Sequence, residues 1–241
     1  MNTPDVFHLP PTHNNWKMTD QTPSISIPLF PVPICLYNYG KDNHELNLSL
    51  ISDISKEVEN DPVGETRSNF GGWHSYDDLE TKYKSFDKLR NQIQESSNNY
   101  CTKHGYKSGL VCKKMWANIN ETGHMNVGHH HGNAALTGVY YPVEKIIDSK
   151  GIFNYTDKNP IQPGIWDGKN GGSIYFQDPS YGLKTKLIKS NIAPTAYNLD
   201  TYYMYPVAGL LILFPSYLIH TVTPFTEDMK RVSISFTADY D

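Results

Sequence analysis

The chain has 241 residues, of which 38% are hydrophobic and 19% are charged, and its formal net charge is −4. This length and composition are typical of one globular domain and exclude a disordered chain. The basic residues are scattered and no segment is apolar enough to span a bilayer, so we expect neither a nucleic-acid partner nor a membrane-embedded protein.

The N-terminal region is rich in proline and has no hydrophobic period, which predicts an arm over residues 1–26. We expect residues 27–241 to form a single domain. It begins with the apolar, proline-interrupted segment Ile27–Tyr37, for which we predict an edge strand because proline cannot donate to a sheet.

Localisation follows from the N-terminus and the cysteines. The arm lacks the basic start and apolar middle of a signal peptide. Cys35, Cys101 and Cys112 are odd in number and lack CxxC spacing, so we expect reduced thiols rather than disulfides. These features predict a soluble protein of the cytoplasm.

Two helices are predicted after the first strand. Residues Glu45–Glu59 carry leucine, isoleucine and valine at four-residue spacing, which is typical of an amphipathic helix. A second helix, at about residues 77–95, has one apolar face between Leu79 and Ile93, and Ser75 followed by Asp78 predicts a capping box at its start. We expect the two helices to cover one face of a sheet.

From about Lys113 onward, short β-rich runs alternate with turn residues. The runs are KKMWANIN, ALTGVYYPV, GSIYFQDP, MYPVAGLLILFPS and VSISFTADY. They predict a mainly β (α+β) sandwich or barrel with a covering layer of N-terminal helices, not a βαβ repeat. The polar stretches around Glu144–Asn170 and Ser180–Tyr202 are predicted to be long loops that act as lids or binding loops.

Histidines form the densest chemical signal. His129, His130 and His131 are consecutive, and because alternate side chains of an extended chain share a face, His129 and His131 can enter a cleft together while His130 points away. His220 follows the apolar run GLLILFPS, where an ionisable ring needs a partner. Three such ligands leave one side of an octahedral metal open, as in non-haem iron oxygenases. The alternative is a solvated loop and a core histidine bonded to the backbone.

Arg231 and Ser233 follow His220 on the next predicted strand and share one face. Arginine offers a planar fork that binds a carboxylate bidentately, and a serine hydroxyl can add a bond to the same group. A dicarboxylic cosubstrate can therefore be anchored there, the alternative being a solvated arginine at a strand end. Asn118 and Tyr140, on flanking strands, are weaker candidates for cosubstrate binding and could equally be structural.

Together, these motifs resemble the bacterial and phage 2-oxoglutarate, Fe(II)-dependent oxygenases with a His-x-His…His motif. The resemblance covers most of the chain beyond residue 27 and runs through LFPVPI, FGGWHSYDDL, WANIN, HHH, LTGVYYPV, FQDP, GLLILFPSYLIHTVTP and RVSISF. It implies a double-stranded β-helix, a jelly roll of the cupin kind. It further implies Fe(II) on His129, His131 and His220, and the distal carboxylate of 2-oxoglutarate on Arg231 and Ser233.

By the same resemblance, the protein is a dioxygenase that uses O₂ and hydroxylates an unidentified small-molecule or peptide substrate, in a bacterial cell or phage-infected host, while 2-oxoglutarate is decarboxylated to succinate. In most of the wider superfamily the second metal ligand is a carboxylate, His-x-Asp. Here His131 stands in that place and leaves the site one unit more positive. Asp178 of FQDP can supply an acid from another strand, although a turn-forming Asp before proline is the plainer interpretation.

Two other functions remain open at this stage. A three-histidine cupin dioxygenase would bind iron without 2-oxoglutarate, and a non-catalytic jelly-roll protein would hold a structural metal or none. In the segment GGWHS, Trp73 and His74 are expected to pack at the mouth of the sheet, with substrate contact as the alternative, and His124 is expected to be a loop residue. A homodimer is compatible with exposed sheet edges.

Overall fold

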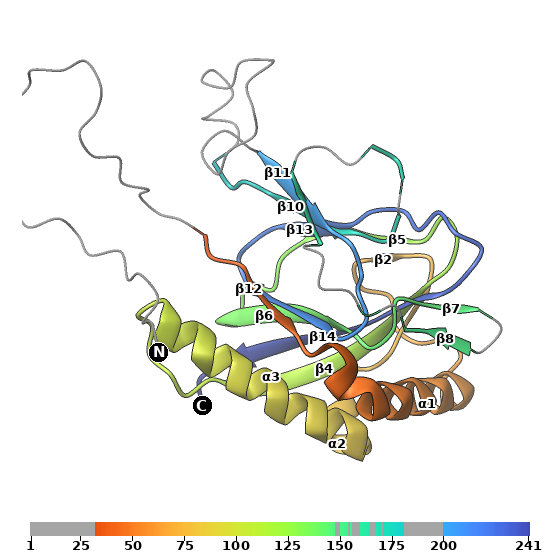
Figure 1. Ribbon diagram of the computed structural model, residues 1–241, viewed down its shortest axis with the longest axis horizontal. Helices are drawn as coiled ribbons and strands as arrows, with labels where there is room; N and C mark the ends of the chain where they lie inside the picture. Colours follow the sequence, from red (N-terminus) through yellow and green to blue (C-terminus); the bar gives the residue numbers. More distant parts are fainter. Residues whose placement is uncertain are drawn as a thin grey trace, which may run out of the picture. The chain divides into compact units, whose positions relative to one another are not determined.

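The computed structural model describes residues 32–147, 150–153, 155, 160–163, 167–169, 171–180 and 200–241. The arm predicted over residues 1–26, and residues 27–31 of the predicted first strand, lie outside the described residues. Within them, two six-stranded antiparallel sheets face each other (Figure 1). The predicted mainly β sandwich is therefore confirmed.

The first sheet has the strand order β1-β12-β6-β14-β4-β3 and carries most of the predicted β-rich runs. Its strands are β1 (Cys35–Asn38), β3 (Trp73–His74), β4 (Val111–Asn120), β6 (Leu136–Tyr141), β12 (Leu210–Pro215) and β14 (Arg231–Asp239). β1 lies at the edge of the sheet, as its prolines predicted, but it is shorter than expected because only Cys35–Asn38 pairs with β12.

The second sheet has the strand order β2-β5-β13-β10-β11-β9. Its strands are β2 (Asn69–Phe70), β5 (Met125–His129), β9 (Ile161–Pro163), β10 (Ile174–Gln177), β11 (Thr201–Met204) and β13 (His220–Val222). A further hairpin joins β7 (Lys145–Ile147) to β8 (Lys150–Ile152). The stretch 144–170 thus contains three short strands and is not the plain loop that we predicted, whereas residues 181–199 of the second predicted loop lie outside the described residues.

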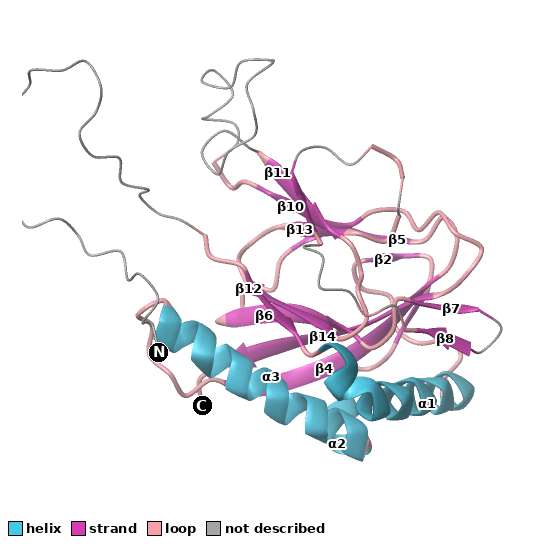
Figure 2. Cartoon of the chain, in the orientation of Figure 1, coloured by secondary structure: helices cyan, strands magenta, loops and turns pink. Residues whose placement is uncertain are grey.

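The helices lie on one side of the first sheet (Figure 2). A short 3₁₀ turn (Gly40–Asn43) leads into α1 (His44–Asn60), which confirms the first predicted helix. The second prediction was wrong in detail, because the segment forms α2 (Leu79–Lys82) and a longer α3 (Lys84–Lys103).

The break between α2 and α3 lies at Tyr83. Its backbone is extended, with φ −128° and ψ 133°, and its hydroxyl donates to Glu57 Oε2 at 2.8 Å. The predicted capping box is also absent, because the Ser75 hydroxyl accepts from the Ala117 amide and donates to the Tyr76 carbonyl. Asp78 is the cap residue of α2 and makes no side-chain capping bond.

Two hydrophobic clusters hold the helices and the two sheets together. One lies between the helices and the first sheet and includes Leu50, Phe86, Leu89, Leu211, Ile234 and Phe236. The other lies between the two sheets and includes Val139, Tyr141, Ile174, Phe176, Ile212 and Phe214. Because the inter-sheet cluster fills only part of the space between the sheets, the other part is left for polar side chains and a cavity.

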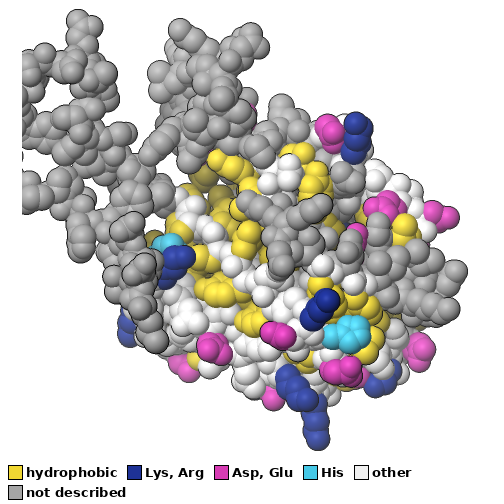
Figure 3. All heavy atoms as spheres, viewed as in Figure 1, with side chains coloured by type: hydrophobic (Ala, Val, Ile, Leu, Met, Phe, Trp, Pro, Cys, Tyr) yellow, Lys and Arg dark blue, Asp and Glu magenta, His cyan; other side chains and the backbone are white. Residues whose placement is uncertain are grey.

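The surface mixes charges, as the scattered basic residues suggested. On the face drawn in Figure 3, Lys and Arg side chains are interspersed with Asp and Glu side chains. None of the helices in the described ranges has the length and hydropathy needed to cross a bilayer.

Candidate active site

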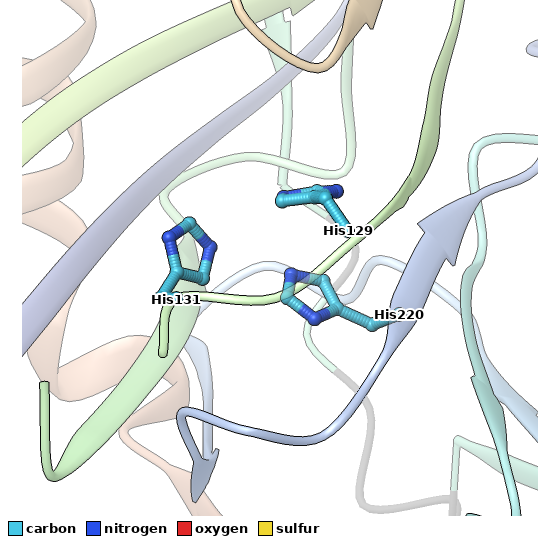
Figure 4. Close-up of side chains that lie close together, drawn as sticks. All are labelled: His129, His131 and His220. Carbon is cyan, nitrogen blue, oxygen red and sulfur yellow. The ribbon is translucent and has the colours of Figure 1, made fainter. Parts of the chain in front are cut away.

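The second sheet brings the three predicted histidines together (Figure 4). His129 ends β5 and His220 begins β13, and the two residues are direct partners in the antiparallel pairing of these strands. His131 lies two residues beyond β5, where its backbone N–H donates to the Ser216 carbonyl at 2.8 Å. One ring nitrogen of each imidazole lies within 4.8 Å of one ring nitrogen of the others, so one metal ion can bind all three.

Backbone carbonyls set the orientation of two of the rings. His129 Nδ1 lies 2.8 Å from the Val127 oxygen and His220 Nδ1 lies 3.0 Å from the Leu218 oxygen. A carbonyl oxygen can only accept, so each Nδ1 carries the proton and each Nε2 keeps its lone pair. This arrangement is the one commonly seen for histidine ligands of metals, in which the second nitrogen is held by a hydrogen bond.

The histidines are also held in their neutral form. Burial, reinforced by the neighbouring His129, lowers the pKa of His220 to about 3 and that of His131 to about 4. Burial lowers the pKa of His129 as well. Because only neutral imidazole binds a metal, the three side chains need to lose no proton near neutral pH.

His130 and Asp178 are not members of this cluster. His130 is exposed, and its Nδ1 accepts from the Gly132 amide. The Asp178 carboxylate accepts hydrogen bonds from the backbone and the hydroxyl of Ser180, at 2.8 and 2.7 Å, as expected of a turn-forming residue. Within the described residues, the group with metal-ligand geometry consists of the three histidines and includes no carboxylate.

The histidines open onto a cavity of about 940 Å³ between the sheets. Its other walls include, from the first sheet, Trp116, Asn118, Tyr141, Phe214, Arg231 and Ser233. The predicted metal and carboxylate groups therefore share one cavity, although they come from opposite sheets.

Arg231 is 1% exposed and is held by four hydrogen bonds. Its Nε donates to the Gly172 carbonyl at 2.7 Å, and its Nη1 donates to Asn120 Oδ1 at 3.1 Å and to Ser233 Oγ at 3.0 Å. Its Nη2 donates to the Tyr141 hydroxyl at 3.2 Å. None of these partners is a carboxylate, and no ion pair of Arg231 occurs among the described residues. A buried cation without a counter-ion is costly, so the site is suited to an anion.

The hydrogen bonds of Arg231 also determine what the neighbouring hydroxyl groups can do. Ser233 and Tyr141 each accept from the guanidinium, so each hydroxyl keeps its own proton to donate elsewhere. One N–H of Nη2 has no partner in the described part of the chain. A carboxylate can thus receive three separate donors, from Arg231, Ser233 and Tyr141. This differs from the bidentate fork that we predicted, because both protons of Nη1 are already used.

The two weaker candidates for cosubstrate binding, Asn118 and Tyr140, lie in different parts of the structure. Asn118 is a cavity residue, and its Oδ1 is buried without a hydrogen-bond partner. Tyr140 lies on the opposite face of β6, where its hydroxyl donates to Asn47 Oδ1 at 2.6 Å and accepts from Asn43 at 3.0 Å. It therefore packs towards α1 and is not a cavity residue. The neighbour that does line the cavity is Tyr141, which the sequence reasoning missed although strand alternation puts adjacent tyrosines on opposite faces.

Trp73, His74 and His124, which the sequence also singled out, lie in three different environments. Trp73 is buried, and its Nε1 donates to the Asp61 carbonyl at 2.8 Å, which is a packing role. His74 is buried but lines the cavity. His124 accepts from the Glu121 amide within a turn and is a loop residue, as expected.

Comparison with known proteins identifies the family. A family profile described as "Putative 2OG-Fe(II) oxygenase" matches residues 114–237, more than half of the chain. The chain belongs to this family. It is a 2-oxoglutarate- and Fe(II)-dependent oxygenase, and the predicted family resemblance is confirmed. No curated protein sequence matches the chain.

Solved structures show the same fold as this oxygenase at low sequence identity. A prolyl-4-hydroxylase from Pseudomonas putida is 12% identical, with 86% of this chain and 92% of that chain covered and a TM-score of 0.55. The carbocyclase SnoK from nogalamycin biosynthesis is 9% identical, covers 86% and 79%, and has a TM-score of 0.57. HygX from Streptomyces hygroscopicus, which contains nickel and 2-oxoglutarate, is 12% identical, covers 87% and 83%, and has a TM-score of 0.53. The predicted double-stranded β-helix is thereby confirmed.

The side chains of the cavity fit the cofactors of the family. Three neutral imidazoles, each with a ring nitrogen in the cluster, are suitable ligands for Fe(II). The buried Arg231, with no carboxylate partner in the described ranges, fits one end of the dicarboxylate 2-oxoglutarate. Both cofactor sites thus have a donor set of the right chemistry.

Proposed function

We propose that His129, His131 and His220 bind the Fe(II) of this oxygenase, and that Arg231, Ser233 and Tyr141 bind the distal carboxylate of its 2-oxoglutarate. The observation that carries the proposal is the shared cavity. Three clustered imidazoles and a buried guanidinium, which has no carboxylate partner among the described residues, lie on its facing walls. A structural metal site would not require a buried anion site beside it.

The charges of the two ends are complementary to the cosubstrate. With His131 in place of a carboxylate, the three ligands are neutral and leave the full charge of a divalent metal on the site. Arg231 adds a further positive charge at the other end of the cavity. A dianion such as 2-oxoglutarate places one negative charge at each end, which balances Arg231 and reduces the charge at the metal end to one positive unit.

The reaction that we propose is hydroxylation of a small-molecule or peptide substrate. Bound Fe(II) and 2-oxoglutarate would supply the activation of O₂, coupled to decarboxylation of 2-oxoglutarate to succinate. The residues of the chain bind and orient: the hydroxyls of Ser233 and Tyr141 donate to the distal carboxylate, and Trp116 and Phe214 on the walls keep water from the cavity. Proteins of this fold include a prolyl hydroxylase crystallised with a peptide and the epimerase SnoN crystallised with nogalamycin RO, so both kinds of substrate are compatible with it.

We further propose that the enzyme acts in the cytoplasm of a bacterial cell or a phage-infected host. Cys35, Cys101 and Cys112 are all free thiols, which supports a reducing compartment. Dimerisation stays a prediction.

A spectroscopic titration tests the assignment of both sites. Fe(II) and then 2-oxoglutarate are added anaerobically to metal-free protein, and the visible charge-transfer band of a keto acid chelated to iron is recorded. We expect the band in the wild type, no band in His131→Ala because the metal is lost, and a band in Arg231→Ala only at much higher 2-oxoglutarate. His130→Ala serves as the matched control and should behave as the wild type. Iron binding without a band would point instead to a three-histidine dioxygenase that does not use 2-oxoglutarate.

A further inference from the structure

A second pair of polar side chains faces the cavity beside the anion site, since Asn118 is the cross-strand partner of Ser233. His74 on β3 and Asn118 on β4 are direct partners in the antiparallel pairing of these strands. Opposed residues of an antiparallel pair point to the same face, and both side chains line the cavity. Each is 6% exposed, so each is nine-tenths buried.

His74 presents a hydrogen-bond acceptor. Its Nδ1 lies 2.6 Å from the Ser75 carbonyl oxygen, so Nδ1 carries the proton and Nε2 has the lone pair. The ring is held by stacking on Trp116, with 5.9 Å between the centroids and 15° between the planes. Nε2 has no hydrogen-bond partner among the described residues.

Asn118 adds a second acceptor beside the first. Its Nδ2 donates weakly to Ser235 Oγ at 3.5 Å, which leaves Oδ1 buried and without a partner. Buried polar atoms are nearly always hydrogen-bonded in native proteins, so an unpaired one on a cavity wall indicates a ligand that completes it. Asn118 Oδ1 is such an atom, and His74 Nε2 on the same wall also has no hydrogen-bond partner in the described part of the chain.

We propose that His74 and Asn118 form a substrate subsite that binds an uncharged NH₂ group, as in a primary carboxamide. The Cα atoms of opposed residues in a strand pair lie about 5 Å apart, so their side chains are neighbours on the cavity wall. One NH₂ group has two diverging N–H bonds and can donate one to each acceptor. A hydroxyl has one proton and satisfies only one of the two acceptors. An ammonium group is disfavoured because Arg231 and a metal with neutral ligands already make the cavity positive.

This subsite rests on the proposed function and gives a role to the segment GGWHS. The segment contributes β3, whose His74 stacks on Trp116, while Trp116 in turn contacts His131 with 5.5 Å between the ring centroids. A group held by His74 and Asn118 therefore lies close to the histidine cluster, as a substrate must.

Calorimetry with two matched amides tests the subsite. Full-length protein is loaded with Zn(II), a redox-inert substitute for iron, and with 2-oxoglutarate, and is titrated with benzamide or with N,N-dimethylbenzamide, which lacks both N–H groups. We expect benzamide to bind about tenfold more tightly or better, as two hydrogen bonds predict. In His74→Phe and in Asn118→Leu the preference should fall towards unity, whereas His74→Gln, which keeps an acceptor near the Nε2 position, should retain part of it.

The controls separate the subsite from folding and from the cosubstrate site. His104→Phe replaces a histidine outside the cavity walls and should keep the full preference for benzamide. The affinity for 2-oxoglutarate, measured first, should be unchanged in His74→Phe, His74→Gln and His104→Phe when these variants are correctly folded. If 2-oxoglutarate binds but the wild type binds the two amides equally, or binds neither, the subsite is wrong and the proposed function stands. If 2-oxoglutarate does not bind, both are wrong.

Discussion

The two ends of the cavity are built in opposite ways. At the metal end, the rings of His129 and His220 are each held by the carbonyl oxygen of the residue two positions earlier. At the anion end, Arg231 is held by residues that lie 59, 90 and 111 positions away in the sequence, as well as by Ser233. The first end is organised locally and the second by the packing of several strands.

This difference indicates how each end should respond to change. The histidine rings keep their orientation as long as β5 and β13 pair, so the metal end should fail only when a ligand is removed. The anion end depends on the close approach of several backbone segments to Arg231, so it should also be sensitive to substitutions that never touch the anion. Changes to the two ends can test this contrast.

Removal of a ligand should give the largest effect. In His220→Ala we expect the affinity for Zn(II) or Fe(II) to fall by about a hundredfold or more, because even loss of a residue that only supports a ligand costs roughly 10- to 100-fold. His130→Ala, which removes an exposed neighbour, should change it little. Metal titration of both variants measures the effect. An equal loss in the two variants would mean that the metal is held by different residues.

Acidification should destabilise the metal-free protein through the same histidines. In the unfolded chain these groups take up protons near pH 6.5, whereas in the folded protein burial lowers the pKa of His220 to about 3 and that of His131 to about 4. The unfolded state therefore binds more protons as the pH falls from about 6.5 to about 4, and the free energy of unfolding decreases by up to about 1.4 kcal/mol per pH unit and group.

Chemical denaturation across this range measures that decrease. His220→Gln, which cannot titrate, should show a shallower dependence on pH than the wild type. Parallel curves for the two proteins would show that His220 is not kept neutral by the fold. Above about pH 7.5 both curves should be flat with respect to histidine, since both states are then neutral.

Close backbone approach at the anion end should make Gly172→Ala destabilising. A Cβ there would lie 2.7 Å from Arg231 Cδ and 3.0 Å from Phe225 Cδ2, and the residue has φ +79°. Overpacking typically costs about 1–3 kcal/mol. Gly168→Ala is the matched control, because its φ is +86° but no atom of the described residues lies within 4 Å of the added Cβ.

The comparison of these glycine variants isolates the contact with Arg231. We expect Gly172→Ala to lose more stability than Gly168→Ala and to bind 2-oxoglutarate more weakly, while its affinity for metal is retained. Equal losses of stability, with 2-oxoglutarate affinity intact in both, would show that the anion end tolerates movement of Arg231. The anion end would then be no more sensitive to distant substitutions than the metal end.

The same contrast explains what the sequence could predict. The His129–His131 pair and the apolar surroundings of His220 are local patterns, so the histidine cluster was predictable. α1 was also predictable, whereas the break lies at Tyr83, whose hydroxyl contacts Glu57, 26 residues earlier, and a local pattern does not show such a contact. The partners of Arg231 depend on which strands are neighbours in the first sheet. Tyr140 and Tyr141 could be told apart only once the face of β6 that meets the helices was known.

Tyr141 gives the finest test of the anion end, because its hydroxyl both accepts from Arg231 and has a proton left to donate. Tyr141→Phe keeps the ring that packs between the sheets and removes only the hydroxyl. We expect the dissociation constant of 2-oxoglutarate to rise by up to about tenfold, since a net hydrogen bond is worth about 0.5–1.5 kcal/mol.

Tyr140→Phe is the matched control at the adjacent position. Its hydroxyl bonds to Asn47 and Asn43, so it should lose stability without losing affinity for 2-oxoglutarate. The reverse result would mean that the cosubstrate lies on the other side of β6.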